Sequence, residues 1–229
     1  MAIFSVVLLT APPSSSDSVG AFVKVDGREC LLRSVELFLN RDNIKQIQLV
    51  VAEEGMEEAK RKFGGHLAFS GVKLLAGGPR WVDQIAAIGQ RIAPECSHVI
   101  VHDAARPAVA YSDIDNLMAE AEKHAIVALT APLRAAVAEV DAANKPLAFH
   151  PASKFMQILT PWCYSKDKFI HMAENRAEPE AGGVTLFRGS SLNLRVNAAS
   201  DAGMIKTMIG MLPKPKMRAL DNPFEEAQW

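Results

Sequence analysis

The stretch Val99-Ile100-Val101-His102-Asp103-Ala104-Ala105-Arg106-Pro107 decides the fold that we expect for this chain. Its apolar, β-branched run ends in a histidine and an aspartate, and an arginine follows after two alanines. This order is typical of a buried parallel strand that delivers polar groups to its carboxyl end, where open α/β sheets place their ligands. A carboxylate and a guanidinium at this spacing can hold a divalent cation and a phosphate in one crevice. From spacing alone, the alternative is that Asp103 caps the next turn and pairs with Arg106 at the surface.

Apolar runs and helical patterns alternate along the rest of the chain. Strands are predicted over residues 3–9, 47–51, 72–75, 126–132, 157–162 and 191–197, with a short strand and turn over 22–28. Helices are predicted over residues 30–39, 53–63, 81–92, 114–124, 166–174 and 199–212. The repeated βα units predict an α/β fold with a three-layer, mostly parallel Rossmann-like sheet and helices on both faces.

Residues 133–151 break this pattern. Weak alternation on both sides of a turn at 142–146 predicts a β-hairpin that protrudes as an arm. Two strands alone are marginally stable in water, so this arm must pack on another surface. We expect a single α/β domain over residues 1–212, which includes the arm, and a tail over 213–229.

Composition excludes several classes of partner. The 229 residues are 49% hydrophobic and 22% charged with a formal net charge of −1, so there is no basic field for a nucleic-acid backbone. Three widely separated cysteines fit reduced core thiols better than disulfides or a zinc site. The apolar run at 3–9 lacks a preceding basic region and is too short to span a bilayer. We therefore expect a cytoplasmic protein with no nucleic-acid or membrane partner.

Two loops are candidates for binding a nucleotide. The loop after the first strand, residues 10–20, stands where doubly wound folds cradle phosphates with backbone N–H groups, but Pro12 and Pro13 lack that donor. Its serines can partly compensate, because hydroxyls donate to phosphate oxygens. Gly77 and Gly78 follow another strand where a base or ribose could contact the main chain, and a plain strand-to-helix turn is the alternative.

The seven residues Val101-His102-Asp103-Ala104-Ala105-Arg106-Pro107 resemble the signature of the methylerythritol phosphate cytidylyltransferases. The order of elements along nearly the whole chain is also similar to that family. The resemblance implies transfer of CMP from CTP to a sugar-alcohol phosphate in isoprenoid precursor synthesis, with release of pyrophosphate. It also implies Mg²⁺ as cofactor, CTP and a small phosphorylated polyol as substrates, and a homodimer formed through the 133–151 arm.

The resemblance assigns roles to individual residues. Asp103 would help to hold the metal, Arg106 and Arg195 would hold the acceptor phosphate, and Lys24 could serve the triphosphate if the first loop is rebuilt. The expected nucleotide-binding residues come from both loops, the signature and the helix after Gly78: Thr10, Ala11, Ser14, Ser15, Gly77, Gly78, Gln84 and Ala104.

The chain departs from the family pattern in the first loop. The family has a glycine-rich loop with an arginine and a lysine there, and both cations are missing here; Gln84 stands in place of a family serine. Each positioned donor at a transferring phosphate is worth about 10²- to 10³-fold in rate. Two functions therefore stay open: a nucleotidyltransferase, or a catalytically impaired relative that binds a nucleotide or a partner protein. The intact Asp103 and Arg106 favour the enzyme.

Overall fold

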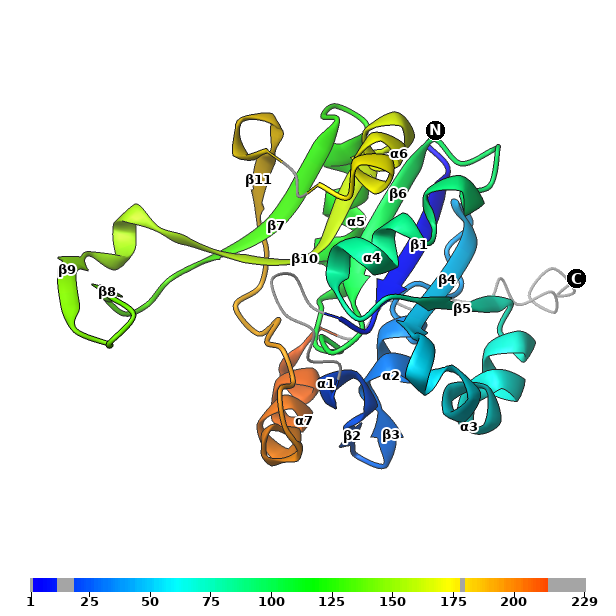
Figure 1. Ribbon diagram of the computed structural model, residues 1–229, viewed down its shortest axis with the longest axis horizontal. Coiled ribbons are helices and arrows are strands. Elements are labelled where there is room, and N and C mark those ends of the chain that lie inside the picture. The colour runs from blue at the N-terminus through cyan, green and yellow to red at the C-terminus, as the bar shows by residue number, and fades with distance from the viewer. Residues whose placement is uncertain (1, 12–18, 178–179, 214–229) are drawn as a thin grey trace, which may run out of the picture.

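A computed structural model describes residues 2–11, 19–177 and 180–213, and its centre is a seven-stranded sheet (Figure 1). The strand order across the sheet is β11 (Thr185–Arg188), β7 (Ile126–Pro132), β10 (Met156–Ser165), β6 (His98–Asp103), β1 (Phe4–Leu9), β4 (Ile44–Ala52) and β5 (Val72–Gly77). All neighbouring strands pair in parallel except β10, which runs antiparallel to both β6 and β7. The prediction of a mostly parallel sheet is confirmed.

Helices cover both faces of this sheet, because its central strands are apolar on both sides. In β1, Phe4, Val6 and Leu8 belong to one buried cluster, whereas Val7 and Leu9 belong to another, as the alternation of side chains along a strand requires. The first cluster contains side chains of α2 (Cys30–Glu36), α3 (Met56–Phe69) and α5 (Tyr111–Ala121). The second contains side chains of α4 (Trp81–Ala86) and α6 (Lys166–Asn175).

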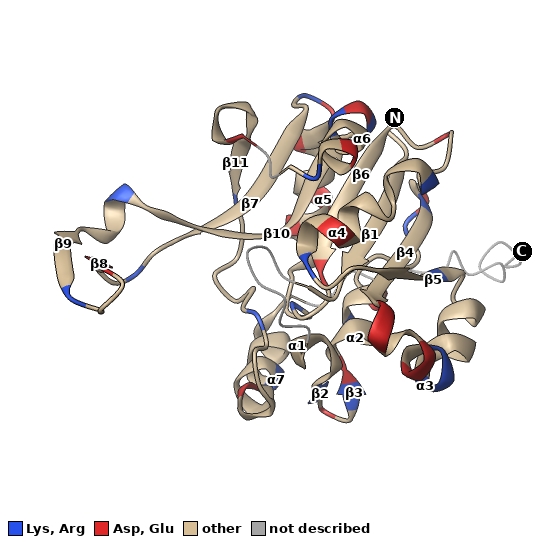
Figure 2. Cartoon of the chain, in the orientation of Figure 1, with Lys and Arg blue, Asp and Glu red and all other residues tan. Residues whose placement is uncertain are grey.

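The helices follow from their apolar spacing. On α5 the buried residues Ile114, Leu117, Met118 and Ala121 recur at the interval of one helical face. On α3 the opposite face carries charges of both signs, with ion pairs such as Lys60 to Glu57 (Figure 2). These charges are solvated and need no functional explanation.

The predicted arm is present as a separate two-stranded sheet, β8 (Val137–Val140) and β9 (Pro146–His150). It projects from the body of the molecule on two long segments that continue β7 and β10 (Figure 1). Asp141 shapes the turn, because its Oδ1 accepts hydrogen bonds from the N–H groups of Ala143 at 2.8 Å and Lys145 at 2.9 Å. The arm therefore has a defined turn but no core of its own.

The short strand and turn predicted over residues 22–28 are present, and the strand is shorter than expected. Residues 22–28 contain the end of the helical turn α1 (Val19–Phe22), then β2 (Lys24–Val25) and the first residue of β3 (Arg28–Glu29). Asp26 and Gly27 between these strands have φ of 52° and 79°, so the turn falls where Gly27 predicted it and closes a tight hairpin.

The predicted last strand at 191–197 is not a strand, and β11 takes the sheet edge instead. The apolar alternation at 191–197 serves a different contact. Val196 packs with Val25, Cys30 and Ile205, the last of which lies on α7 (Ala202–Met211). The N–H of Val196 donates to the carbonyl of Ala105 at 2.9 Å. Residues 191–197 therefore lie against the loop that follows β6.

The described cysteines Cys30, Cys96 and Cys163 are all buried and unpaired with one another, as expected for reduced core thiols. Burial raises the pKa of the Cys30 thiol to about 12, so that this thiol stays protonated near neutral pH. Across residues 2–11, 19–177 and 180–213, no helix has the length and apolar character that crossing a membrane requires.

Candidate active site

The site forms where β1 and β6 end side by side. Leu9 and Asp103 are register partners in these two strands, and the N–H of Ala104 donates to the Leu9 carbonyl at 2.8 Å. From β1 the sheet extends through β4 in one direction and through β6 in the other. The carboxyl ends of β1 and β6 therefore meet at a topological switch point, the usual place for a ligand in an open α/β sheet.

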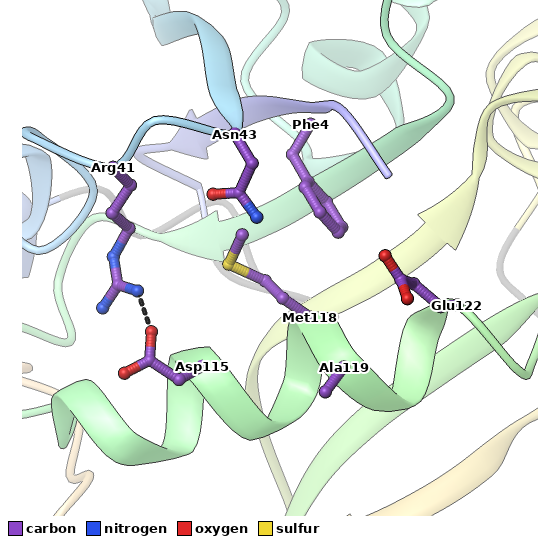
Figure 3. Close-up of a pocket in the computed structure, with 7 residues that line it drawn as sticks. All are labelled: Phe4, Arg41, Asn43, Asp115, Met118, Ala119 and Glu122. Atoms are coloured by element: carbon purple, nitrogen blue, oxygen red, sulfur yellow. Dashed lines mark hydrogen bonds and ion pairs between the residues drawn. The ribbon is translucent and has the colours of Figure 1, made fainter. Parts of the chain in front are cut away.

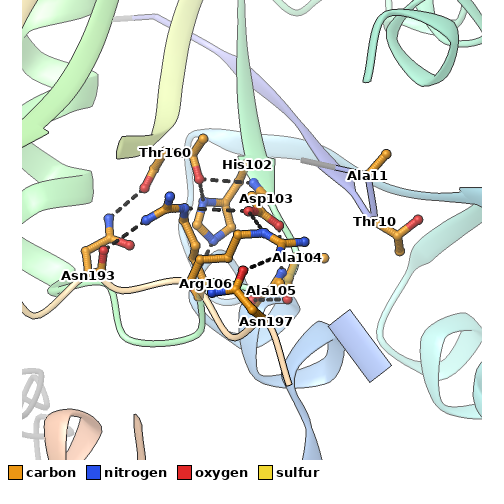
Figure 4. A network of polar contacts seen from close by, with 12 residues as sticks. Thr10, Ala11, His102, Asp103, Ala104, Ala105, Arg106, Thr160, Asn193 and Asn197 are labelled. Atoms are coloured by element: carbon orange, nitrogen blue, oxygen red, sulfur yellow. Dashed lines mark hydrogen bonds and ion pairs between the residues drawn. The ribbon is translucent and has the colours of Figure 1, made fainter. Parts of the chain in front are cut away.

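Asp103 is fully buried and joins two guanidinium groups (Figure 4). Its Oδ1 accepts from the N–H of Ala105 at 2.9 Å, and its Oδ2 accepts from Nε of Arg195 at 2.9 Å. Nε of Arg106 lies 3.5 Å from the same Oδ2. Burial raises the pKa of the Asp103 carboxyl, while the charge of Arg195 acts in the opposite direction. One buried carboxylate thus orients both arginines.

Among the described residues, Arg106 and Arg195 share the single carboxylate of Asp103. The side chain of Arg106 is 13% exposed and that of Arg195 is 12% exposed. Nη1 of Arg106 donates to the Asn193 carbonyl at 3.0 Å, and Nη1 of Arg195 donates to Oδ1 of Asn197 at 2.7 Å. Neighbouring guanidinium groups are suited to binding a phosphate group, because each presents several N–H donors to its oxygens. The structure brings together Asp103, Arg106 and Arg195, as the resemblance to the family implied, while their roles stay predictions.

Three buried polar residues support the loop that carries Arg106. Thr160 on β10 donates its hydroxyl to Nδ1 of His102 at 3.1 Å and accepts from the N–H of Asp103 at 3.1 Å. Nε2 of His102 then donates to the Arg106 carbonyl at 3.1 Å. Nδ2 of Asn193 donates to the Thr160 carbonyl at 2.7 Å. Burial lowers the pKa of His102 to about 3, so this histidine is neutral, and its contacts give it a structural role.

The sequence did not single out Thr160 or Asn193 as functional residues. Both residues make their contacts with residues far away in the sequence. Their neighbours Leu159 and Leu194 fit an ordinary apolar pattern, which gives no sign of a functional site. The only signal was their place in the order of segments that resembles the family.

Several of the expected nucleotide-binding residues lie close together at the end of β1, but their side chains are buried. Thr10, Ala11, Gln84 and Ala104 are all fully buried. Oε1 of Gln84 accepts from the N–H groups of Thr10 at 3.1 Å and Ala11 at 3.2 Å. The carbonyl of Ala104 accepts from the Ser34 hydroxyl at 3.0 Å. The roles of these residues in binding stay predictions, and Ser14 and Ser15 lie outside the described residues.

Gly77 and Gly78 are required by close packing. A Cβ on Gly77 would lie 2.8 Å from Cγ1 of Val50, and a Cβ on Gly78 would lie 2.5 Å from Cβ of Asp83. The absence of side chains at both positions lets α4 pack closely onto the end of β5. The alternative of a structural turn is sufficient to explain both glycines.

Lys24 lies on the small β2–β3 hairpin and pairs with Glu29 at 3.6 Å. Its side chain is 66% exposed. Among the contacts of the described residues, none joins Lys24 to Asp103, Arg106 or Arg195. The structure does not bring this expected catalytic residue to the site.

The arrangement at Asp103 does not fit a magnesium ion. Mg²⁺ in nucleotide sites is bound through one or two carboxylates together with waters and phosphate oxygens. Both oxygens of Asp103 already accept hydrogen bonds, and an ion at Oδ2 would lie beside the positive charges of Arg195 and Arg106, whose Nε atoms are 2.9 Å and 3.5 Å from that oxygen. In the part of the chain that the structure describes, no group of three or more His, Cys, Asp or Glu residues is placed to hold a metal.

A cavity of about 220 Å³ lies at the opposite end of β1 (Figure 3). Its wall includes Phe4, Met118 and three charged side chains. Arg41 forms an ion pair with Asp115, and Oε1 of Glu122 accepts from the N–H of Ala2 at 2.9 Å. Because these charges are used within the protein, the cavity has no feature of a second site.

The fold and the arginine-rich switch point define the class of the protein as an α/β nucleotidyltransferase-like protein. Solved structures support the fold: the 4-diphosphocytidyl-2C-methyl-D-erythritol synthase of Anaerococcus prevotii has a TM-score of 0.74 at 15% identity, covering 91% of this chain and 96% of that one. The 2-C-methyl-D-erythritol 4-phosphate cytidylyltransferase of Thermus thermophilus has a TM-score of 0.69 at 18% identity, covering 88% and 96%.

Sequence comparison identifies the family. The model of the family "IspD: 2-C-methyl-D-erythritol 4-phosphate cytidylyltransferase" matches residues 14–205. The enzyme of that name from Rhodopirellula baltica is 27% identical over 216 residues, with 85% of this chain and 88% of the relative covered. The one from Dehalococcoides mccartyi is 22% identical over 199 residues, with 82% and 87% covered. The chain belongs to the IspD family, as its signature predicted.

Proposed function

We propose that this protein transfers CMP from CTP to 2-C-methyl-D-erythritol 4-phosphate or a closely related phosphorylated polyol. An oxygen of the acceptor phosphate attacks the α-phosphorus of CTP, the bond from that phosphorus to the oxygen bridging to the β-phosphate breaks, and pyrophosphate leaves. The observation that carries the proposal is the cluster of Asp103, Arg106 and Arg195 at the switch point of a chain that belongs to the IspD family.

The chemistry of this reaction depends on positioning and on charge. Two phosphate groups must approach one another, and their mutual repulsion opposes the attack. We assign Arg106 and Arg195 the role of neutralising the acceptor phosphate. Asp103 fixes the direction of both guanidiniums through Oδ2. The resemblance implies Mg²⁺ as well, but since the carboxylate does not fit the ion as arranged, we derive no step through it.

The nucleotide side of the proposed site lies at the end of β1. The residues that we propose to meet the nucleotide from the described part of the chain are Thr10, Ala11, Gly77, Gly78, Gln84 and Ala104. Lys24 takes part only if its hairpin moves and gives up the pair with Glu29. An unchanged KM for CTP in Lys24→Ala would remove Lys24 from the proposal.

The arm is proposed to bind a second copy of the chain. Phe149 and Leu147 on β9 are 77% and 63% exposed, and Val140 on β8 is 48% exposed. Such apolar side chains on a hairpin without a core call for a covering surface. We expect Phe149→Asp to shift the mass measured by light scattering from dimer to monomer. Phe69→Asp, at a 92% exposed phenylalanine on α3, is the matched control; an unchanged mass in Phe149→Asp would refute the dimer arm.

The compartment that we propose for this reaction is the cytoplasm. The three cysteines are buried and form no disulfide, which agrees with a reducing environment.

Pyrophosphate release tests the proposed reaction. With CTP and methylerythritol phosphate, the wild-type protein should release pyrophosphate, and Arg106→Ala should lower kcat/KM by about 10²-fold or more. Arg61→Ala on the exposed face of α3 is the matched control and should leave the rate unchanged. The absence of release by the wild type, together with retained binding of CTP, would favour the impaired nucleotide-binding relative. The observation that favours this impaired relative is that both carboxylate oxygens of Asp103 already accept hydrogen bonds within the protein.

A further inference from the structure

The contact between Gln84 and the end of β1 is an unusual use of a buried side chain. Oε1 of Gln84 accepts from two successive backbone N–H groups, those of Thr10 and Ala11. Nε2 of Gln84 lies 3.3 Å from Oγ1 of Thr10, which completes a closed network. The N–H of Thr10 is shared with the Val50 carbonyl at 3.2 Å, whereas the Ala11 donor is directed at Gln84. A side chain of α4 thus occupies main-chain donors of another element.

Close packing builds this contact into the fold. A Cβ on Gly77 would lie 3.1 Å from Cα and 3.3 Å from Cγ of Gln84, so glycine at 77 is what lets the glutamine approach. Gln84 is fully buried, and its carboxamide has no freedom to turn over, because a reversed amide would direct N–H groups at the donors of Thr10 and Ala11.

The position of these donors gives the contact a functional meaning. Thr10 and Ala11 directly follow β1, at the switch point where Asp103 ends the neighbouring strand. Backbone N–H groups at this edge of a sheet are donors for a ligand's acceptor atoms, such as the carbonyl oxygen and ring nitrogen of a nucleobase. In this chain the carboxamide oxygen of Gln84 stands at that place.

We infer that Gln84 is an internal competitor that occupies the donors of Thr10 and Ala11 and so weakens the binding of a nucleobase at the end of β1. The inference rests on the proposed function, because it takes CTP as the ligand. A nucleotide must either bind without these two donors or displace the glutamine and leave its amide without partners. Gln84 is therefore a determinant of affinity rather than a catalytic residue.

Calorimetric titration of CTP tests the inference. Gln84→Met keeps the volume of the side chain but removes its acceptor, and Gln84→Ala opens the space as well. Both variants should bind CTP about tenfold more tightly than the wild type, which corresponds to one or two hydrogen bonds of typical net strength. Gln90→Ala, at an exposed glutamine just beyond α4, is the matched control and should bind as the wild type does.

The direction of the change separates this role from a purely structural one. If Gln84 only supports the fold, both variants will bind CTP equally or more weakly, and the inference is overturned. Should Gln84→Ala fail to fold, the volume-conserving Gln84→Met decides between the two. Pyrophosphate release by the wild type is measured separately. If the wild type releases pyrophosphate but the variants bind CTP with unchanged affinity, only the inference about Gln84 is refuted. If the variants bind CTP more tightly but the wild type releases no pyrophosphate, only the proposed reaction is refuted.

Discussion

Acidification should destabilise this protein through His102. The imidazole is fully buried, donates from Nε2 to the Arg106 carbonyl and accepts at Nδ1 from Thr160. Its pKa is lowered by burial from 6.5 to about 3. Between these values the unfolded chain binds a proton that the folded chain does not, so the stability is complete above pH 6.5 and falls as the pH falls. The slope is about 1.4 kcal/mol per pH unit, or about 2 kcal/mol lost at pH 5.

Urea unfolding at a series of pH values measures this effect. The free energy of unfolding of the wild type should fall more steeply between pH 6.5 and pH 4.5 than that of His102→Asn, by about 1.4 kcal/mol per pH unit. His124→Asn, at a partly exposed histidine, is the control and should keep the wild-type slope. Equal slopes in the wild type and His102→Asn would refute the reasoning, as would an NMR titration of His102 in the folded protein near pH 6.5.

Three further predictions follow from contacts in or near the site. Asp103→Asn should lower the free energy of unfolding by about 3–5 kcal/mol, measured in urea, because it leaves two mostly buried guanidiniums without their carboxylate; a loss below about 1 kcal/mol would contradict this. Gly20→Ala should lower the free energy of unfolding by about 1–3 kcal/mol or more, because the new Cβ would lie 1.8 Å from the Val196 carbonyl oxygen. Gly65→Ala, which has open space around it in α3, should raise the free energy of unfolding by roughly 0.5–1 kcal/mol in the same assay. Mg²⁺ titrated without nucleotide should give no binding heat at Asp103, and a signal lost in Asp103→Ala would show this to be wrong.

The architecture and the place of the site followed from the sequence because both depend on local pattern. A β-branched run that ends in His102-Asp103 predicts a buried strand with a polar carboxyl end, and the structure has β6 there. The segment 191–197 was mistaken for a strand, because alternating Leu192, Leu194 and Val196 look the same whether they face a sheet or a loop and helix. No local pattern distinguishes the two cases.

The finer arrangement of the site depends on contacts between distant residues. The sequence predicts that Gln84 lies on a helix after the glycine turn. It does not predict that the carboxamide of Gln84 contacts Thr10 and Ala11, because these residues lie far away along the chain. For the same reason, the sequence does not reveal that Lys24 pairs with Glu29 on a separate hairpin. The sequence offered a pair of Asp103 and Arg106 only as a surface alternative, whereas the burial of Asp103 and the use of its Oδ2 by Arg195 required the fold.

The most direct test of the account is the rate of pyrophosphate release by the wild type and by Asp103→Asn, with CTP saturating and the phosphorylated polyol varied. If Asp103 holds Arg106 and Arg195 against the acceptor phosphate, the wild type turns over and the variant loses about 10²-fold or more in kcat/KM for the acceptor. A folded Asp103→Asn protein with the wild-type kcat/KM would contradict the claim that this carboxylate organises the site.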